Sequence, residues 1–599
     1  MMKRIMDILP MLWLLWLTVL RVEQRWSEAD VILASGLPWV CGTAWLISMW
    51  RGHGRVTAVD ILVMTWAVYY VIRVWCGGEF SCAVECLRVM VMVVLYVGLR
   101  MWWGGHGVME CGLPLGIILG GSVEAVMGLM QMMNGTSRHH LYVLTGSFLN
   151  PGPYSAYLMM GGVMGTAWLR SGVLKCDFVV RLLGNCKLAE WLTLRNLVLS
   201  LTLLMLVVLP STWSRAAIVG VVVCVLLIFH DLAWKYRYWL AGAFAVVIVG
   251  LYFVKQGSAD GRMMTWQASL RTWSHVPWLG VGVGGFCHAT AEGYCEMLAK
   301  SDVSCDFASA GVAEYPCNEF LKVLVEQGVV GAVLCVVTVA VAMFRLFVGC
   351  RVLFWGMCSM ILFSMFSYPM SMLPYCVIVI MVIAWNESGK NIGVFLRCNR
   401  IMTTFVAIVV AGGGCWLAHE VGRRHEIDSE CRLFSGMRNA AFINDYYELM
   451  PEETDNPQFL FDFGTVLREQ KRYSDSNAVM RMGTRVSADP MFYVVMGNNY
   501  ADMEEPDEAG MCYMKASGVM PNRLYPLYKL MMMYNDLGDR EKTLYTAQRI
   551  IESMPKIPSK ATRRMQERAS QIKDSLMMTD IPKRHADMMP YVSGDDETR

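Results

Sequence analysis

Polar side chains that could take part in chemistry lie where a polar segment of the sequence passes into a hydrophobic run. The stretch PCNEFLKVLVEQGVVG (316–331) carries Asn318, Glu319, Lys322 and Glu326 just before the apolar sequence GAVLCVVTVAVAMF. Charged groups are costly in lipid and usually have a partner or a function there. The i, i+3, i+7 spacing of the three charged residues places them on one helix face, where they can neutralise one another or line a site.

A second candidate is an arginine at the start of another hydrophobic run. In PSTWSRAAIVG (210–220), Arg215 follows Ser211 and Ser214, and either serine can cap a helix through its hydroxyl oxygen. The guanidinium group can hold a phosphate through two hydrogen bonds, or it can extend to lipid headgroups. The residues alone leave both interpretations open.

Further arginines occur in GSADGRMMTWQASLRTWSHVPWLGVGVGGF (257–286). Arg262, Trp266 and Arg271 follow one another at spacings of four and five residues, which we interpret as positions near one helix face. The glycine-rich end GVGVGG lacks the G-x-G-x-x-G spacing of a dinucleotide-binding turn, so it indicates a flexible loop.

A fourth polar stretch is TGSFLNPGPYSAY (145–157), which contains Asn150 between glycines and prolines. This composition is typical of a tight turn before a helix. Free N–H groups at such a helix start suit an anion, and a simple helix cap is the alternative interpretation.

The composition predicts an all-α membrane protein. The chain of 599 residues is 55% hydrophobic and 17% charged, with a mean hydropathy of +0.40, which is too apolar for a soluble protein. The first hydrophobic run follows Lys3 and Arg4 without a small-residue cleavage site, so we expect a retained signal anchor. The runs predict a polytopic bundle of about 12–13 transmembrane helices. They cover residues 7–23, 30–50, 57–77, 82–103, 107–132, 153–170, 192–209, 214–232, 237–254, 318–346, 352–370, 371–386 and 401–419.

The distribution of lysine and arginine sets the expected orientation. The N-terminus and the loops on its side, including RGHGR (51–55) and NESGKNIGVFLRCNR (386–400), hold about seventeen of these residues, against about four in the short loops on the other side. The N-terminus is therefore expected in the cytoplasm. Segment 255–317 and everything after residue 420 are expected outside it.

Four cysteines lie in or next to this outer segment, namely Cys287, Cys295, Cys305 and Cys317. An oxidising exterior permits disulfides, and four cysteines allow three full pairings, among which the sequence does not choose. They contain no C-x2-C pair, so they do not indicate a zinc site.

After residue 420 the composition becomes that of a helical domain without membrane spans. Gly464 and Gly497 are 33 residues apart, as are Pro457 and Pro490. A period near 34 residues resembles tetratricopeptide repeats, and a plain helical bundle is the alternative. The expected domains are a membrane domain at 1–419, a tetratricopeptide-like solenoid at 420–575 and a disordered tail at 576–599.

The four polar stretches, in this order, resemble the bacterial O-antigen ligase family, which also includes O-antigen polymerases and protein O-oligosaccharyltransferases. The resemblance covers residues 110–390. Asn318, Gly328 and Gly331 keep the register of the family's late motif, whose first position is His in ligases and Cys317 here. Variants of the family with a tetratricopeptide tail are similar to the whole chain.

The resemblance implies a glycosyltransferase of surface polysaccharide assembly. Such enzymes transfer a glycan from an undecaprenyl-diphosphate carrier to an acceptor hydroxyl at the periplasmic face of the inner membrane, and no metal or other cofactor is expected. Arginines would stabilise the charge that develops on the leaving diphosphate. The catalytic candidates are Arg215, Arg262, Cys317, Asn318 and Glu319, and the substrate-binding candidates are Asn150, Ser214, Trp266, Arg271, Lys322 and Glu326.

The departure at Cys317 leaves the base open, because a thiol is a poor substitute for imidazole. Glu319, Glu314 and His288 are the alternatives. The expected partners are a lipid-linked oligosaccharide donor, a glycan, lipid A-core or protein acceptor, and the inner membrane. The tail could bind an envelope protein, and no nucleic acid is expected. Other functions compatible with the residues are a protein O-oligosaccharyltransferase, a non-enzymatic transporter of lipid-linked glycans and a scaffold.

Overall fold

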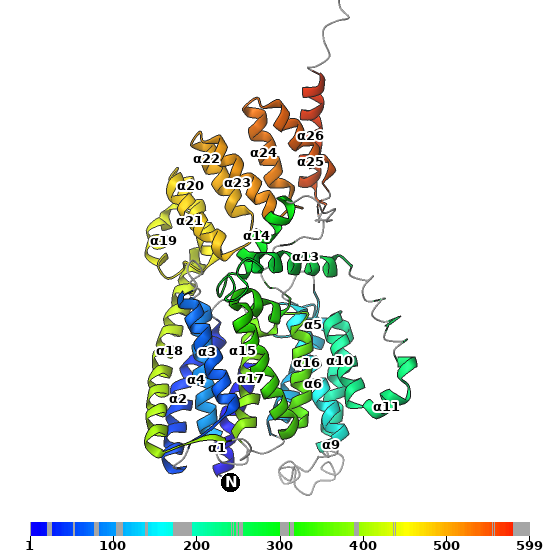
Figure 1. Cartoon of the computed structure of the whole chain (residues 1–599), viewed down its shortest axis with the longest axis vertical. Helices are drawn as coiled ribbons and strands as arrows, with labels where there is room; N and C mark the ends of the chain where they lie inside the picture. The colour runs from blue at the N-terminus through cyan, green and yellow to red at the C-terminus, as the bar shows by residue number, and fades with distance from the viewer. Residues whose placement is uncertain are drawn as a thin grey trace, which may run out of the picture.

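The structure of the protein is a computed structural model, and its helices form a bundle that carries a second helical part at one end (Figure 1). The described residues are 2–20, 27–51, 54–76, 83–103, 112–137, 142–171, 194–240, 242, 245–246, 250, 256–299, 311, 315, 317–388, 394–434, 437, 439–553, 555 and 558–578.

The bundle is built from long helices that run side by side (Figure 1). Their bounds are α1 (Met2–Leu17), α2 (Glu28–Arg51), α3 (Ala58–Cys76), α4 (Ala83–Trp103), α5 (Gly112–Asn134), α6 (Pro151–Ser171), α9 (Leu194–Val208), α10 (Arg215–Ile228), α11 (His230–Lys235), α15 (Glu319–Gly349), α16 (Arg351–Ser364), α17 (Leu373–Ser388) and α18 (Arg400–Phe434). Two short 3-10 helices join them, η1 (Leu209–Thr212) and η3 (Pro369–Ser371).

Several bundle helices have the length and composition of membrane spans. Within the described part of the chain, six helices are long and apolar enough to cross a membrane, and three shorter helices are also apolar. This confirms the predicted all-α polytopic bundle. The predicted span at 237–254 lies mostly outside the described residues. The six long spans are Glu28–Leu46, Ala58–Cys76, Gly112–Asn134, Leu194–Thr212, Glu319–Gly349 and Arg400–Phe434.

Small residues bring the central helices of the bundle close together. A Cβ atom at Gly121 of α5 would lie 2.7 Å from the sulfur of Met205 of α9, and one at Gly161 of α6 would lie 2.6 Å from the same sulfur. Close approach of this kind is how membrane helices gain packing contacts without a hydrophobic driving force between them. Residues of α5, α6 and α9 are part of the large buried core of the bundle.

Two loops at the end of the bundle that is remote from α13 and α14 pair as a short antiparallel sheet. Strand β1 (Gly54–Thr57) pairs with β2 (Val394–Cys398), with Arg55 opposite Arg397. Both strands belong to loops that the lysine and arginine distribution placed on one side of the membrane, and the pairing agrees with that expectation.

Two helices of the predicted outer segment lie between the bundle and the tail (Figure 1). They are α13 (Gln256–Trp273) and α14 (Phe286–Ala299). They pack closely, because Gly293 of α14 lies directly against the backbone of Ala268 and the Thr272 hydroxyl donates to the Ala289 carbonyl at 2.6 Å. Helix α13 thereby connects the bundle to α14.

The tail consists of paired antiparallel helices. After η4 (Ala440–Phe442) and α19 (Ile443–Leu449) it contains α20 (Pro457–Glu469), α21 (Tyr473–Val486), α22 (Met491–Asp502), α23 (Pro506–Val519), α24 (Leu524–Asp536), α25 (Arg540–Glu552) and α26 (Lys560–Met578). The first helices of three successive pairs begin at Pro457, Met491 and Leu524, which is the spacing expected from the sequence period. Helix α18 continues across the expected domain boundary at 419/420. The tetratricopeptide assignment stays a prediction, and the expected disordered tail lies mostly outside the described residues.

Candidate functional site

Two polar side chains of α5 form hydrogen bonds with the turn that precedes α6. Glu124, which is fully buried, accepts hydrogen bonds from the backbone N–H of Ser147 at 3.0 Å and from its hydroxyl at 2.6 Å. Gln131 accepts from the N–H groups of Thr145 and Gly146 at 2.9 and 2.8 Å. The sequence motif at 145–157 therefore owes its shape to α5, whose polar residues the sequence interpretation did not single out.

Asn150 occupies the end of this turn and caps α6. Its Oδ1 accepts a hydrogen bond from the Gly152 N–H at 3.0 Å, and its Nδ2 donates to the Tyr368 hydroxyl at 3.1 Å. Tyr368 is in turn stacked on Tyr315, with ring centroids 4.2 Å apart. The helix-cap interpretation of the motif is thus supported, and Asn150 also connects α6 to the link between α16 and α17.

That link, residues 365–372, is a meeting point of the sequence motifs. Arg262 of α13 donates from Nη1 to the Phe366 carbonyl at 2.9 Å, and Glu319 of α15 accepts from the Met370 N–H at 2.9 Å. With Asn150 on Tyr368, three candidates from three separate motifs contact one short link. Sequence reasoning missed this link. The signal that could have found it is MFSYPMSMLPY, a turn rich in serine and proline between two apolar runs.

The two arginine candidates lie close enough to influence each other electrostatically. Arg215 is the first residue of α10 and interacts through its charge with Arg262. Ser214 is the N-cap residue, but its side chain forms no capping hydrogen bond. Trp213, just before it, has a left-handed backbone with φ of 53°, a strained conformation that often accompanies functional sites. The start of α10 therefore places a helix N-terminus beside two cations, an arrangement that suits an anion.

Cys317 adjoins the same arginine. It forms a hydrogen bond with Arg262 and has a left-handed backbone with φ of 50°. Burial raises the pKa of its thiol above the ordinary value of 9.0, and this outweighs the opposite effect of the Arg262 charge. Within the described part of the chain, Cys287, Cys295 and Cys317 form no disulfide, and Cys305 lies outside the described residues. Cys317 is accordingly a neutral thiol near neutral pH.

Asn318 begins α15 as its N-cap. Its Oδ1 accepts a hydrogen bond from the Leu321 N–H at 3.0 Å, as expected for an asparagine at this position. The cap orients the first turn of the helix so that Glu319 reaches the 365–372 link.

The charged stripe at the start of α15 is buried and extends to another helix. Glu319 and Glu326 are 9% and 2% exposed, and Lys322 interacts electrostatically with both. Glu85 at the start of α4 acts on both glutamates as well, and it was missed by the sequence interpretation. Glu326 accepts backbone hydrogen bonds from Gly284 and Phe286, so its carboxylate caps the start of α14. The charge of Lys322 thus acts on both glutamates, and α4 adds a further acid.

The remaining candidates on α13 separate into two groups. Trp266 packs against an apolar cluster formed by α14 and α15, which includes Leu321 and Val325. Arg271 instead forms an ion pair with Glu296 of α14, with 3.7 Å between Nε and Oε2. The expectation that Arg262 and Arg271 share a helix face was wrong, because nine residues at 3.6 residues per turn place them about half a turn apart.

The alternative bases have different positions. His288 contacts the Thr484 carbonyl of the tail at 3.3 Å and Glu292 at 3.8 Å. It belongs to the contact between α14 and the tail. Glu314 lies outside the described residues. Of the three alternative bases, Glu319 is the one that the structure places beside Cys317.

Helix α15 is broken two residues after Glu326, at Gly328, and the glycine-rich loop packs against the break. Gly328 has φ of 68° and ψ of −170°. The backbone N–H groups of Val329 and Val330 donate hydrogen bonds to the loop, to the carbonyls of Pro277 at 2.9 Å and of Trp278 at 3.3 Å. The loop also donates from residues 281 and 282 to the carbonyls of residues 325 and 326, at 2.9 and 3.0 Å. The GVGVGG segment is a loop as predicted, but its backbone is paired with α15 rather than free.

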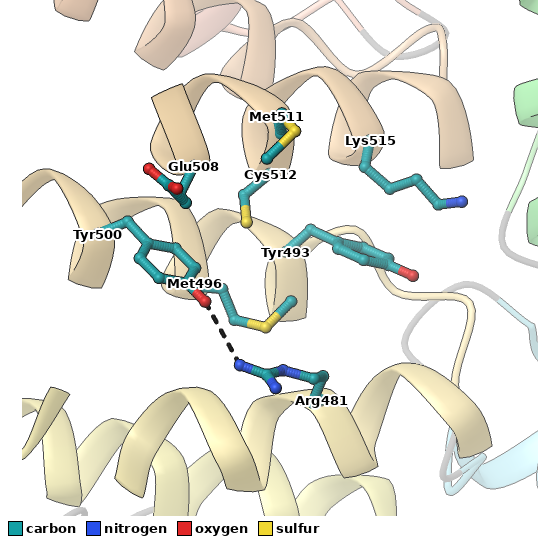
Figure 2. Close-up of a pocket in the computed structure, with 8 residues that line it drawn as sticks. All are labelled: Arg481, Tyr493, Met496, Tyr500, Glu508, Met511, Cys512 and Lys515. Carbon is teal, nitrogen blue, oxygen red and sulfur yellow. Dashed lines mark hydrogen bonds between the residues drawn. The ribbon is translucent and has the colours of Figure 1, made fainter. Parts of the chain in front are cut away.

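A cavity of about 330 Å³ lies in the tail, away from the sequence motifs (Figure 2). Figure 2 shows Arg481 of α21 facing Tyr493, Met496 and Tyr500 of α22, and its guanidinium group donates to the Tyr500 hydroxyl at 3.3 Å. Residues of α23 form the rest of the lining, namely Glu508, Met511, Cys512 and Lys515. No candidate site residue lines this cavity. No cluster of metal-ligating side chains was found among the residues that the structure describes.

Comparison with known proteins gives a match in the segment that contains both arginine candidates. No curated protein matches the chain. A family model described as O-antigen ligase matches residues 200–336, which include α10, α13, α14, the break in α15 and the candidates from Arg215 to Glu326. In this segment the chain is similar to the O-antigen ligase family, which supports the resemblance seen in the sequence.

Proposed function

We propose that the protein transfers a glycan from an undecaprenyl-diphosphate carrier to an acceptor hydroxyl. The family indicates a glycosyltransferase-like role in surface polysaccharide assembly. The observation that carries the finer proposal is the proximity of Arg215, at the N-terminus of α10, to Arg262 on α13. Two cations and a helix N-terminus are suited to a diphosphate, and they would stabilise it most as it leaves with additional charge.

The reaction needs one bond to form and one to break. The acceptor oxygen attacks the anomeric carbon, and the bond from that carbon to the diphosphate oxygen breaks, so the electron pair leaves with the diphosphate. Arg215 and Arg262 stabilise that charge through charge-assisted hydrogen bonds. Arg262 is held ready for this role because one of its donors is bound to the Phe366 carbonyl.

The proton of the acceptor hydroxyl must pass to a base, and we propose Glu319. Its carboxylate is fixed by the Met370 N–H and lies near Cys317, the position at which ligases have histidine. Cys317 itself is disfavoured as a base because its raised pKa keeps the thiol protonated. Asn318 and Asn150 shape the surrounding backbone through their capping bonds, which leaves Trp266 and Lys322 as candidates for contacts with the sugar.

We further propose that the protein resides in the inner membrane with a cytoplasmic N-terminus and a periplasmic tail. The proposal is supported by the pairing of β1 with β2 at one end of the bundle and by α13, α14 and the tail at the other. The donor headgroup would then reach Arg215 from the outer leaflet. The acceptor would be lipid A-core, a growing polymer or a protein.

Reconstitution of the full chain with undecaprenyl-diphosphate glycan and each class of acceptor tests the proposal. Release of undecaprenyl diphosphate is expected in the wild type, and Arg215→Ala or Arg262→Ala should slow it by at least about 100-fold. Arg271→Ala is the matched control, because Arg271 lies on the same helix as Arg262 but pairs with Glu296. It should change the rate by less than about threefold.

Two results would contradict this function. Translocation of the glycan lipid without release of undecaprenyl diphosphate would identify a transporter. Equal loss of activity in Arg262→Ala and Arg271→Ala would show that the assay responds to general damage of α13 and not to the proposed diphosphate site.

A further inference from the structure

Helix α3 reaches the break in α15 with three side chains that lie outside all of the sequence motifs. Trp66 donates from Nε1 to the Gln327 side-chain oxygen at 3.0 Å, and the Tyr69 hydroxyl donates to the Gln327 carbonyl at 2.7 Å. Arg73, one turn further along, donates from Nη2 to the Gly280 carbonyl at 3.3 Å. These residues thus contact both partners of the interrupted region, namely α15 and the glycine-rich loop.

The surroundings make these bonds energetically important. Gln327 is 2% exposed and Arg73 is 8% exposed, so neither can exchange its partner for bulk water. A buried polar group without a hydrogen bond is costly, and backbone groups near lipid must be satisfied within the protein. The Gln327 carbonyl lies next to the break at Gly328, where a regular helix cannot satisfy it, and Tyr69 supplies the donor. Helix α3 therefore stabilises the broken form of α15 specifically.

The break is connected to the arginine on α13 by packing. Trp266 and Trp273 of α13 pack against an apolar cluster that joins Leu321 and Val325 of the outer piece of α15 to the start of α14. The loop that α3 contacts through Gly280 follows directly after α13 in the chain. A displacement of the break would therefore move α13, and with it Arg262, relative to the start of α10.

We propose that Trp66, Tyr69 and Arg73 are positioning residues that set the location of Arg262 opposite Arg215 by holding the break in α15. This inference rests on the proposed function, since the distance between the two arginines matters for a diphosphate between them. A misplacement of about 1 Å commonly costs an enzyme on the order of 100-fold in rate.

The double variant Trp66→Phe/Tyr69→Phe removes both donors to Gln327 while keeping the aromatic rings, and Trp75→Phe is its control because Trp75 lies on the same helix and is 82% exposed. The double variant should lower kcat for undecaprenyl-diphosphate release by about 10–100-fold, with KM for the donor changed less than about threefold. The thermal unfolding temperature should stay within a few degrees of wild type. The control should match the wild type in all three measurements.

A distance measured between α10 and α13 tests the positioning role independently of the proposed transferase activity. Spin labels at Trp213→Cys and Met263→Cys, exposed neighbours of Arg215 and Arg262, are placed in a background whose accessible cysteines are serine. The double variant should shift or broaden the distance distribution between the labels, whether or not the wild type shows transferase activity. An unchanged distribution would overturn the positioning role. A shifted distribution with an unchanged kcat would overturn its relevance to the reaction, and an inactive wild type would refute the proposed function alone.

Discussion

Replacement of Gly328 by alanine tests whether the break in α15 is a required feature of the fold. Gly328 has φ of 68° and ψ of −170°, a region that is essentially restricted to glycine. A Cβ atom there would lie 2.2 Å from the Trp278 carbonyl oxygen and 2.5 Å from the Leu279 nitrogen. Both contacts are with backbone, so no side-chain rotation relieves them, and the glycine-rich loop must move away.

The expected cost follows from two contributions. The backbone strain is about 1–3 kcal/mol. The movement of the loop also stretches the four hydrogen bonds that cross the break, whose lengths are 2.9, 3.0, 2.9 and 3.3 Å. Loss of two of them adds about 1–3 kcal/mol. Together the local stability of the break should fall by about 2–6 kcal/mol, which corresponds to at least about 30-fold faster amide exchange in residues 276–282 and 325–330.

Hydrogen–deuterium exchange with mass spectrometry on the full chain in nanodiscs measures this effect peptide by peptide. Gly412→Ala in α18 is the matched control, because nothing lies within 4 Å of a Cβ atom at that position. In a helix interior it should be neutral or stabilising by up to about 1 kcal/mol. If Gly328→Ala leaves exchange in 276–282 and 325–330 at the rate seen with Gly412→Ala, the loop does not depend on the break and the reasoning is refuted.

Three further predictions concern other parts of the molecule. The thiol of Cys317 should be alkylated by iodoacetamide only slowly at pH 8 and should become reactive above the ordinary thiol range, since burial raises its pKa; mass spectrometry showing half-maximal reactivity near pH 8 would contradict this. Glu124→Ala leaves both Ser147 donors unsatisfied and should destabilise by about 2–4 kcal/mol, whereas Glu124→Gln keeps an acceptor and should cost less, as thermal unfolding in detergent can show. Lys515→Met breaks a 2.7 Å ion pair with Glu292 whose partners are about one-third exposed, so the loss should be below about 1 kcal/mol. Burial lowers the pKa of Lys515, but the hydrogen bond to Glu292 and the nearby negative groups together raise it above the ordinary lysine value of 10.5. The pair is therefore fully stabilising below that value and is lost at higher pH, so the variant should differ from wild type at pH 8 but not at strongly alkaline pH.

Most of the architecture could be predicted from hydrophobicity because lipid permits few alternatives to a helix. Apolar runs of about twenty residues, such as those now seen as α5 and α18, have no other way to satisfy their backbone groups. The helix pairs of the tail were also visible, since Gly464 and Gly497 recur where a small residue is needed against the second helix of each pair. The break at Gly328 was not predictable in the same way. A glycine in an apolar run is equally typical of close helix packing, and its backbone angles leave no trace in composition.

The sequence predicted which motifs contribute to the candidate site, but it did not predict the role of each residue. The arginine motifs were expected on one side of the membrane, and Arg215 and Arg262 do lie near each other. Arg271 belongs to the same stretch of sequence, yet it points to α14 and not to the site. The link at 365–372 was overlooked because its contacts with Arg262 and Glu319 go through its backbone, and a backbone N–H or carbonyl has no residue type to recognise.

Buried carboxylates explain why role assignment from sequence is hardest at this site. Glu319 and Glu326 lie in the same stripe and are both nearly inaccessible, so composition gives them equal claims to chemistry. Their partners separate them: Glu326 satisfies the backbone of Gly284 and Phe286 at the start of α14, which accounts for its presence without any substrate. Glu319 also accepts a backbone hydrogen bond. In addition, it lies beside Cys317, which is hydrogen-bonded to Arg262. A charged side chain near a membrane is costly and needs a partner or a function. For Glu326, the backbone hydrogen bonds are a sufficient structural explanation. For Glu319, the adjacent arginine and the strained backbone of the cysteine are additional features that a structural role does not require.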